Sequence, residues 1–240
     1  MFDQVHFVLD HLPSLLIGFP GQRPGGLFLS LLLAVFAVGM GLLIALPVGL
    51  GYSARRRSIH WASRIYVEIF RGIPLIVLLL LVYQVVGGRR TGLDLGPRAA
   101  ALIALTLYSS AYQAEILRAG LRSVPEALTE SARLMGGSRW HVLRTVQLRY
   151  AVRVMLPAFT GQAISLFKDT SVVIIIGVAE LMTVARIVLG ADVTYAPYWI
   201  TVYIAVGLLY FVVAFTLSRL ANRWERSRPS SELVQTLAVP

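Results

Sequence analysis

The stretch SLFKDTSVVIII, residues 165–176, places a lysine and an aspartate side by side inside an apolar run. Lys168 is the only lysine in the sequence, and Asp169 is followed by two hydroxyl side chains, Thr170 and Ser171. Together these groups could form ion pairs and hydrogen bonds with a charged ligand. They could instead interrupt a helix, because short polar side chains compete for backbone hydrogen bonds. The sequence leaves both roles open.

Three further acidic residues lie in or beside apolar stretches. The i, i+3 spacing predicts that Glu68 pairs with Arg71 and that Glu115 pairs with Arg118. A charge at the centre of a membrane span costs about 2.5–3.5 kcal/mol, which cancels the gain from roughly five apolar side chains. We therefore expect these groups either to pair with one another or to line a hydrated cavity, where Glu68 and Glu115 become candidate substrate contacts. Glu180 is a further candidate for either role.

Several kinds of chemistry have no support in the sequence. The chain contains no cysteine, and its four histidines are scattered at positions 6, 11, 60 and 141 without metal-ligand spacing. No serine, histidine and acidic residue form a recognisable catalytic set. A Walker A loop requires a glycine framework around its lysine, and Lys168 has none. We expect no catalytic group, metal site or cofactor in this chain.

The composition indicates an integral membrane protein. The chain has 240 residues, of which 57% are hydrophobic and only 14% are charged, whereas a soluble domain has about a quarter charged residues. The formal net charge of +10 comes from arginine clusters between apolar stretches. Such clusters mark cytoplasmic loops, and no nucleic-acid recognition module accompanies them. We therefore expect a lipid bilayer, and no nucleic acid, as a partner.

The apolar runs predict an all-α protein with about five transmembrane helices. They lie near residues 27–52, 65–86, 99–119, 155–189 and 198–220, and the second is interrupted by Arg71-Gly72-Ile73-Pro74. The arginine clusters place the N-terminus outside and the C-terminus in the cytoplasm. Residues 155–189 would form a straight helix of roughly 50 Å, against about 30 Å of hydrocarbon. We expect this crossing to break, with Phe167–Ser171 as the break.

The pattern of the polar segment 123–148, between the third and fourth spans, predicts two short helices. Ser123 and Glu126 have the spacing of a capping box, and Gly136-Gly137 should end the first helix. Ser138 is placed to cap the second helix. The apolar face of the first helix should contain Leu128, Ala132 and Met135. Such a pair could lie on lipid or fit a groove on a cytoplasmic partner.

Three regions follow from this pattern. Residues 1–26 form an N-terminal segment whose apolar positions recur at helical spacing, which predicts an amphipathic helix on the membrane surface, with a disordered tail as the alternative. Residues 27–220 form the transmembrane domain, and residues 221–240 form a cytoplasmic tail.

The segment GLRSVPEALTESARLMGGSRWHVLRTVQLR resembles the cytoplasmic signature of ABC-importer permeases. The triplet Glu130-Ser131-Ala132 is followed at the family spacing by Gly136 and by Val146-Gln147-Leu148, although Arg149 stands where the signature has proline. Three other stretches are similar to the polar amino-acid uptake subfamily: YVEIFRGIPLI, AYQAEILRAGL and KDTSVVIIIGVAEL. The four motifs occur in the family order.

The resemblance implies a type I importer in the bacterial cytoplasmic membrane. Its partners would be a second permease subunit, two ABC ATPases that carry ATP and Mg, and an extracytoplasmic substrate-binding protein. Glu126, Glu130, Ser131, Ala132 and Gly136 would form the coupling helix that contacts the ATPase. An amino acid carries an ammonium and a carboxylate, which neighbouring Asp, Lys and hydroxyl groups suit. The alternative is a self-contained carrier or channel driven by an ion gradient.

Overall fold

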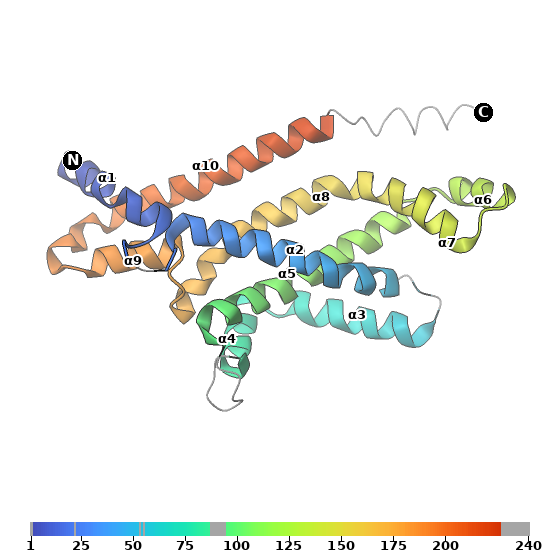
Figure 1. Cartoon of the computed structure of the whole chain (residues 1–240), viewed down its shortest axis with the longest axis horizontal. Coiled ribbons are helices and arrows are strands. Elements are labelled where there is room, and N and C mark those ends of the chain that lie inside the picture. Colours follow the sequence, from blue (N-terminus) through green and yellow to red (C-terminus); the bar gives the residue numbers. More distant parts are fainter. Residues whose placement is uncertain (1, 22, 53, 55, 87–94, 227–240) are drawn as a thin grey trace.

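The structure is a computed structural model that describes residues 2–21, 23–52, 54, 56–86 and 95–226. These residues form a helical bundle (Figure 1). The α-helices are α1 (Phe2–Ile17), α2 (Gly26–Tyr52), α3 (Arg57–Gly72), α4 (Leu75–Val86), α5 (Gly96–Arg122), α6 (Glu126–Leu134), α7 (Arg139–Val142), α8 (Leu148–Asp169), α9 (Leu181–Gly190) and α10 (Trp199–Arg226). A π-helical turn, η1 (Leu143–Gln147), and two 3₁₀ segments, η2 (Thr170–Ile176) and η3 (Val193–Tyr198), complete it.

Helix α5 lies at the centre and contacts α2, α3, α4 and α8. Its contact with α2 is extensive. Helix α2 buries a small residue at every fourth position: Ala37, Gly41, Ala45 and Gly49. A Cβ added at Gly41 would lie 3.2 Å from the Cβ of Ser109, and one at Gly49 would lie 3.0 Å from the carbonyl oxygen of Ala114. Small residues let helix backbones pack this closely. In a membrane this van der Waals packing holds helices together, because apolar side chains gain no hydrophobic free energy by moving out of lipid.

The second apolar run is broken where the sequence predicted. Helices α3 and α4 meet at an angle of 106°. Ile73 has extended backbone angles because Pro74 follows it. Proline disfavours the helical conformation of the preceding residue, and it has no N–H group to continue the helical hydrogen bonds. The chain therefore turns sharply between the two helices.

The break in the fourth run lies later than predicted. Helix α8 continues without a turn through Lys168 and Asp169 and tightens into the 3₁₀ segment η2, so that Arg139–Ile176 is one helical segment of 38 residues. The chain reverses at Gly177, whose φ of +73° lies in the left-handed region that glycine adopts without strain. The expected break at Phe167–Ser171 is therefore wrong. The polar residues mark only the change from α to 3₁₀ geometry.

Fewer than five helices meet the length and hydropathy expected of a span. Within the described residues these are Gly26–Tyr52, Arg139–Ile176 and Val193–Trp224, with the bent pair α3–α4 as a fourth. Helix α5 has 27 residues but is not among them. Its polar residues Ser109, Ser110 and Gln113 are buried against neighbouring helices, and this enclosure removes them from lipid. An all-helical membrane protein is confirmed, and the number of crossings stays a prediction.

The predicted N-terminal segment is helical, so the disordered alternative is wrong. Phe7 and Leu15 of α1 are buried, and the Phe7 ring stacks on Tyr198 with centroids 4.7 Å apart. Val5 and Leu9, two residues of the predicted apolar stripe, are 50% and 55% exposed, and the location of this helix on the membrane surface stays a prediction. Helices α1 and α9 lie at one end of the long axis, and α6 and α7 lie at the other (Figure 1). The predicted tail lies outside the described residues from residue 227 onward.

Candidate functional site

The central helix α5 carries a stripe of large polar side chains on a partly open face. Tyr108 and Tyr112 are one turn apart with ring centroids 4.7 Å apart, and Glu115 follows three residues later. Arg71, from the last turn of α3, lies over the Tyr112 ring at 5.2 Å from its centroid. This arrangement combines aromatic, cationic and anionic groups along one side of a membrane protein. We call Tyr108, Tyr112, Glu115 and Arg71 the α5 stripe.

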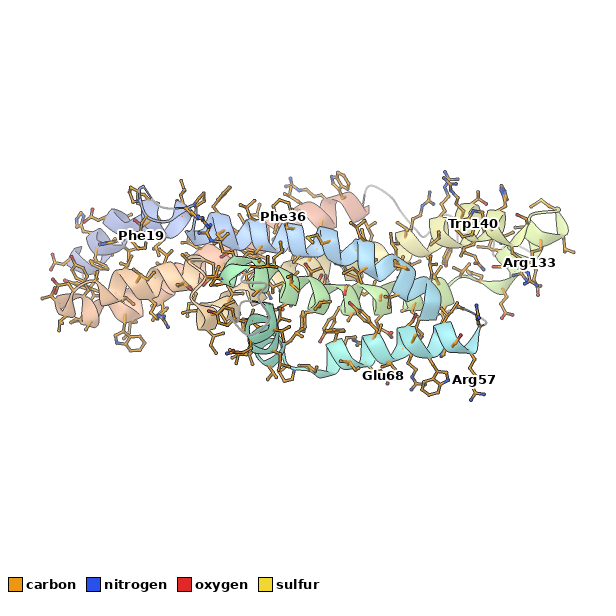
Figure 2. All side chains as sticks on the ribbon, turned by 60° about the horizontal axis from the view of Figure 1, so that its bottom comes forward. Phe19, Phe36, Arg57, Glu68, Arg133 and Trp140 are labelled. Carbon is orange, nitrogen blue, oxygen red and sulfur yellow. The ribbon has the colours of Figure 1, made fainter. Side chains whose placement is uncertain are left out.

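Glu115 is the electrostatic centre of the stripe. Its carboxylate accepts hydrogen bonds from Nε of Arg118 at 2.8 Å and from a second Arg118 nitrogen. Its Oε1 also lies 3.9 Å from Arg71. The predicted Glu115–Arg118 pair is confirmed, but the predicted Glu68–Arg71 pair is wrong. Glu68 instead binds Arg64 at 2.7 Å, and its side chain is 57% exposed on the outer face of α3 (Figure 2).

The residues that drew attention in the sequence lie near the opposite end of the stripe. Asp169 is half-buried and close enough to Tyr108 for an electrostatic interaction. Lys168 is exposed and Ser171 is half-buried. Thr170 is fully buried and donates a hydrogen bond to the carbonyl oxygen of Phe167 at 2.7 Å. The structure therefore brings Asp169 to the stripe and turns Thr170 into the core.

A buried polar cluster behind the stripe was missed in the sequence. The Nε2 atom of Gln113 donates to the carbonyl oxygen of Val38 at 3.1 Å and to the hydroxyl of Ser109 at 2.8 Å. Gln162 of α8 donates to the same hydroxyl at 3.2 Å. The amide oxygens of both glutamines and the hydroxyl of Thr106 have no hydrogen-bond partner in this structure. Buried polar groups are normally paired, so these three atoms are the unsatisfied members of an otherwise hydrogen-bonded cluster.

Glu180 anchors the other end of the molecule. Its fully buried carboxylate caps α9 by accepting from the N–H groups of Met182 at 3.0 Å and Thr183 at 2.9 Å. It also accepts from the hydroxyls of Tyr210 on α10 at 2.8 Å and Ser30 on α2 at 3.3 Å. One carboxylate thereby joins three helices. Glutamate is not among the residues preferred at an N-cap, so the local sequence carried no signal for this role.

The next acidic residue along the chain, Asp192, caps η3. The N–H and hydroxyl of Thr194 both donate to Oδ1 of Asp192 at 2.8 Å. These hydrogen bonds favour the ionised carboxylate and hold the pKa of Asp192 below its usual value. Asp192 is therefore an exposed structural cap.

The predicted helix pair between the third and fourth spans is present as α6 and α7. Gly136 has a φ of +85° and ends α6, as predicted. The Oγ of Ser138 accepts from the N–H of His141 at 3.3 Å, as predicted. The capping box is wrong, because the hydroxyl of Ser123 donates back to Gly120 at 2.8 Å and Pro125 occupies the N-cap position. Met135, on the predicted apolar face, is 82% exposed and packs against no core in the described part of the chain.

The tip of this hairpin projects from one end of the bundle. Arg133 lies near the tip and Trp140 lies on the adjoining arm (Figure 2). Leu134 and Met135 expose 89% and 82% of their surface. The signature residues Glu126, Glu130, Ser131 and Gly136 are exposed, and Ala132 is half-buried. An exposed apolar pair between charged residues is typical of a surface that contacts another protein.

Known proteins with similar sequences are membrane transport subunits. The chain is 30% identical over 207 residues to the Glutamate/aspartate import permease protein GltK of Escherichia coli O6:H1, covering 84% of this chain and 91% of that protein. It is 30% identical over 201 residues to the Glutamine transport system permease protein GlnP of Escherichia coli K12, covering 84% and 90%. The L-cystine transport system permease protein TcyB of Bacillus subtilis is 30% identical over 229 residues, covering 91% and 96%.

Solved structures agree with the sequence comparison. A crystal structure of an amino acid ABC transporter with histidines superposes with a TM-score of 0.79 at 31% identity, covering 95% of this chain and 98% of the other. The inward-facing MetNI methionine ABC transporter gives a TM-score of 0.65 at 25% identity over 82% of this chain and 94% of the other. The family described as "Binding-protein-dependent transport system inner membrane component" matches residues 37–228. This chain belongs to that family.

Proposed function

We propose that this chain is the permease subunit of an ATP-driven importer for a polar amino acid. The observation that carries the proposal is the superposition on an amino acid ABC transporter over 95% of the chain at 31% identity. Relatives named as glutamate/aspartate, glutamine and cystine permeases support the same cargo class. These likenesses favour ATP-driven import and give no support to a carrier driven by an ion gradient.

The cargo would pass along the α5 stripe. Asp169 would accept the ammonium group at the end of the stripe near η2, with Lys168 and Ser171 beside it to bind the carboxylate. Arg71 and Glu115 would line the other end of the path, with the Glu115–Arg118 ion pair as a movable obstruction. Glu68 is paired with Arg64 on the outer face, and Thr170 is occupied inside. We therefore assign neither Glu68 nor Thr170 a contact with the cargo.

The α6–α7 hairpin would couple this path to an ATPase. Leu134 and Met135 supply an exposed apolar tip, and Glu126, Glu130 and Ser131 supply polar contacts around it. Gly136 and Gly137 fix the turn, since a Cβ at Gly137 would lie 2.6 Å from the carbonyl oxygen of Ala132. A rigid turn lets movement of the ATPase be passed to α8, which continues from η1.

The same proposal covers assembly and orientation. Five crossings, with α5 as the third, place the N-terminus outside and the α6–α7 hairpin in the cytoplasm of a bacterial cell. The assembly would contain a second permease subunit, two ATPases that bind ATP and Mg, and an extracytoplasmic binding protein. The described arginines near the hairpin support this orientation through the excess of positive charge on cytoplasmic loops.

Reconstitution of the complete transport complex in proteoliposomes tests the proposal. We expect amino-acid uptake that requires ATP and the binding protein, with Asp169→Asn lowering uptake and cargo-stimulated ATP hydrolysis together. Asp192→Asn is the matched control, because that carboxylate caps η3 at the surface. Uptake that follows an ion gradient without ATP would refute the importer. Full activity of Asp169→Asn with Ser171→Ala would refute only the assigned path.

A further inference from the structure

A cavity of about 610 Å³ lies where the ends of α2 and α5 meet the arm that leads from α7 into η1. The lining residues include Leu50, His60, Leu121, Arg122, Trp140 and Leu143. This cavity is separate from the α5 stripe. The π-helical geometry of η1 contributes to its wall, since the N–H of Leu148 bonds to the carbonyl oxygen of Leu143 five residues earlier.

The polar groups of this cavity suit an anion. Arg122 is exposed and forms no salt bridge with any residue in the described part of the chain. Nδ1 of His60 donates to the carbonyl oxygen of Tyr52 at 2.6 Å, which holds the ring in the wall of the cavity. Among the described lining residues there is no carboxylate. A guanidinium that faces such a space can bind a phosphate group.

The remaining walls suit a molecule that is only partly polar. Leu50, Leu121 and Leu143 give the cavity an apolar side. Trp140 is 67% exposed at its rim, and Figure 2 shows it near the same end of the molecule as Arg57. Tryptophan and tyrosine favour the boundary between lipid headgroups and hydrocarbon. The last turn of α2 and the last turn of α5 reach this boundary together in the proposed orientation.

We propose that this cavity binds the headgroup of an anionic phospholipid from the cytoplasmic leaflet. The phosphate lies against Arg122, and the glycerol and upper acyl chain lie against the leucines. Basic pockets between transmembrane helices on the cytoplasmic side are established binding places for such headgroups. The lipid joins α2 and α5 to the arm beside the α6–α7 hairpin. The inference rests on the proposed orientation and is independent of the cargo.

Native mass spectrometry of the full-length chain, titrated with phosphatidylglycerol, tests this site. We expect one tightly bound lipid in the wild type, and Arg122→Gln should raise its dissociation constant about tenfold, as for the loss of one charge-assisted hydrogen bond. Arg122→Lys should retain part of the affinity. Arg133→Gln removes the same charge at the hairpin tip and should leave binding unchanged.

Two further arms identify the source of the anion. Phosphatidylcholine should not occupy the site, and glycerol 3-phosphate should not displace phosphatidylglycerol, because it lacks the acyl chains that contact the leucines. Displacement by glycerol 3-phosphate would overturn the lipid assignment in favour of a soluble anion. Equal loss of binding in Arg122→Gln and Arg133→Gln would show general attraction to charge and overturn the site. Loss of amino-acid uptake without loss of lipid binding would concern the proposed function alone.

Discussion

Replacement of Glu180 by glutamine should destabilise the end of the molecule formed by α9. The Oε1 atom of Glu180 accepts from the N–H of Thr183 at 2.9 Å and from its hydroxyl at 3.1 Å. The Oε2 atom accepts from the N–H of Met182 at 3.0 Å and from the hydroxyl of Tyr210 at 2.8 Å. An amide places an NH₂ group at one of these positions. Either orientation sets it against a backbone N–H that cannot turn into an acceptor.

The magnitude follows from two losses. Removing an N-cap hydrogen bond costs about 1 kcal/mol, and leaving buried donors unsatisfied costs about 1–3 kcal/mol. The free energy of unfolding should therefore fall by about 2–4 kcal/mol in Glu180→Gln. Glu68→Gln makes the same chemical change at a carboxylate that is 57% exposed. Water replaces its lost hydrogen bond, so its effect should be much smaller.

The assay is equilibrium unfolding of the purified full-length chain in mixed micelles, read by circular dichroism for both variants. Hydrogen exchange adds a local measurement, because the amides of Met182 and Thr183 should lose protection while those of α6 do not. Equal unfolding free energies for Glu180→Gln and Glu68→Gln would refute the reasoning. That result would mean that the carboxylate does not join α9 to α2 and α10.

Three other changes test the packing and the charges. Gly49→Ala should lower the free energy of unfolding by about 1–3 kcal/mol through overpacking against α5. Gly39→Ala should be neutral or stabilising, because a Cβ there meets nothing within 4 Å. Equal effects of the two changes would contradict the packing. Glu115→Gln should lower the free energy of unfolding by about 1 kcal/mol, because the ion pair with Arg118 is partly exposed. Adding Arg118→Gln should lower it little further, and additive losses would contradict the pairing. Because the pKa of Asp192 is lowered on folding, its stabilisation of η3 is present above the ordinary aspartate pKa and should disappear as the pH falls through the lowered value. Hydrogen exchange in η3, corrected for intrinsic rates, measures this loss, and a pH response retained in Asp192→Asn would rule it out.

Local patterns were sufficient to predict several elements. The apolar run of α2 and the start of α10 follow from hydropathy, although α10 continues to Arg226, beyond the predicted end at residue 220. The turn at Pro74 follows from the missing N–H group of proline. The cap at Ser138 and the end of α6 at Gly136 are properties of one or two residues and their immediate neighbours. Membership of a membrane transport family was also readable, because the coupling-loop signature and three further motifs occur in order along the chain.

The position of the chain reversal and the partners of the charges depend on contacts between distant segments. Polar residues at Lys168–Ser171 suggested a break, but the helical segment continues from α8 into η2 and ends only at Gly177, which has a positive φ. Arg71 follows Glu68 at the i, i+3 spacing of a helical pair, but the packing of α3 on α5 directs it to Glu115 instead.

The sequence by itself determined the membrane class, the principal helices and the family, since these follow from hydropathy and residue order. Only the tertiary structure decided that Asp169 approaches Tyr108, that Glu180 joins three helices and that Arg122 faces a cavity. The physical reason is that each of these relations joins residues far apart in the chain. Their distances are set by how whole helices pack, which local spacing does not specify.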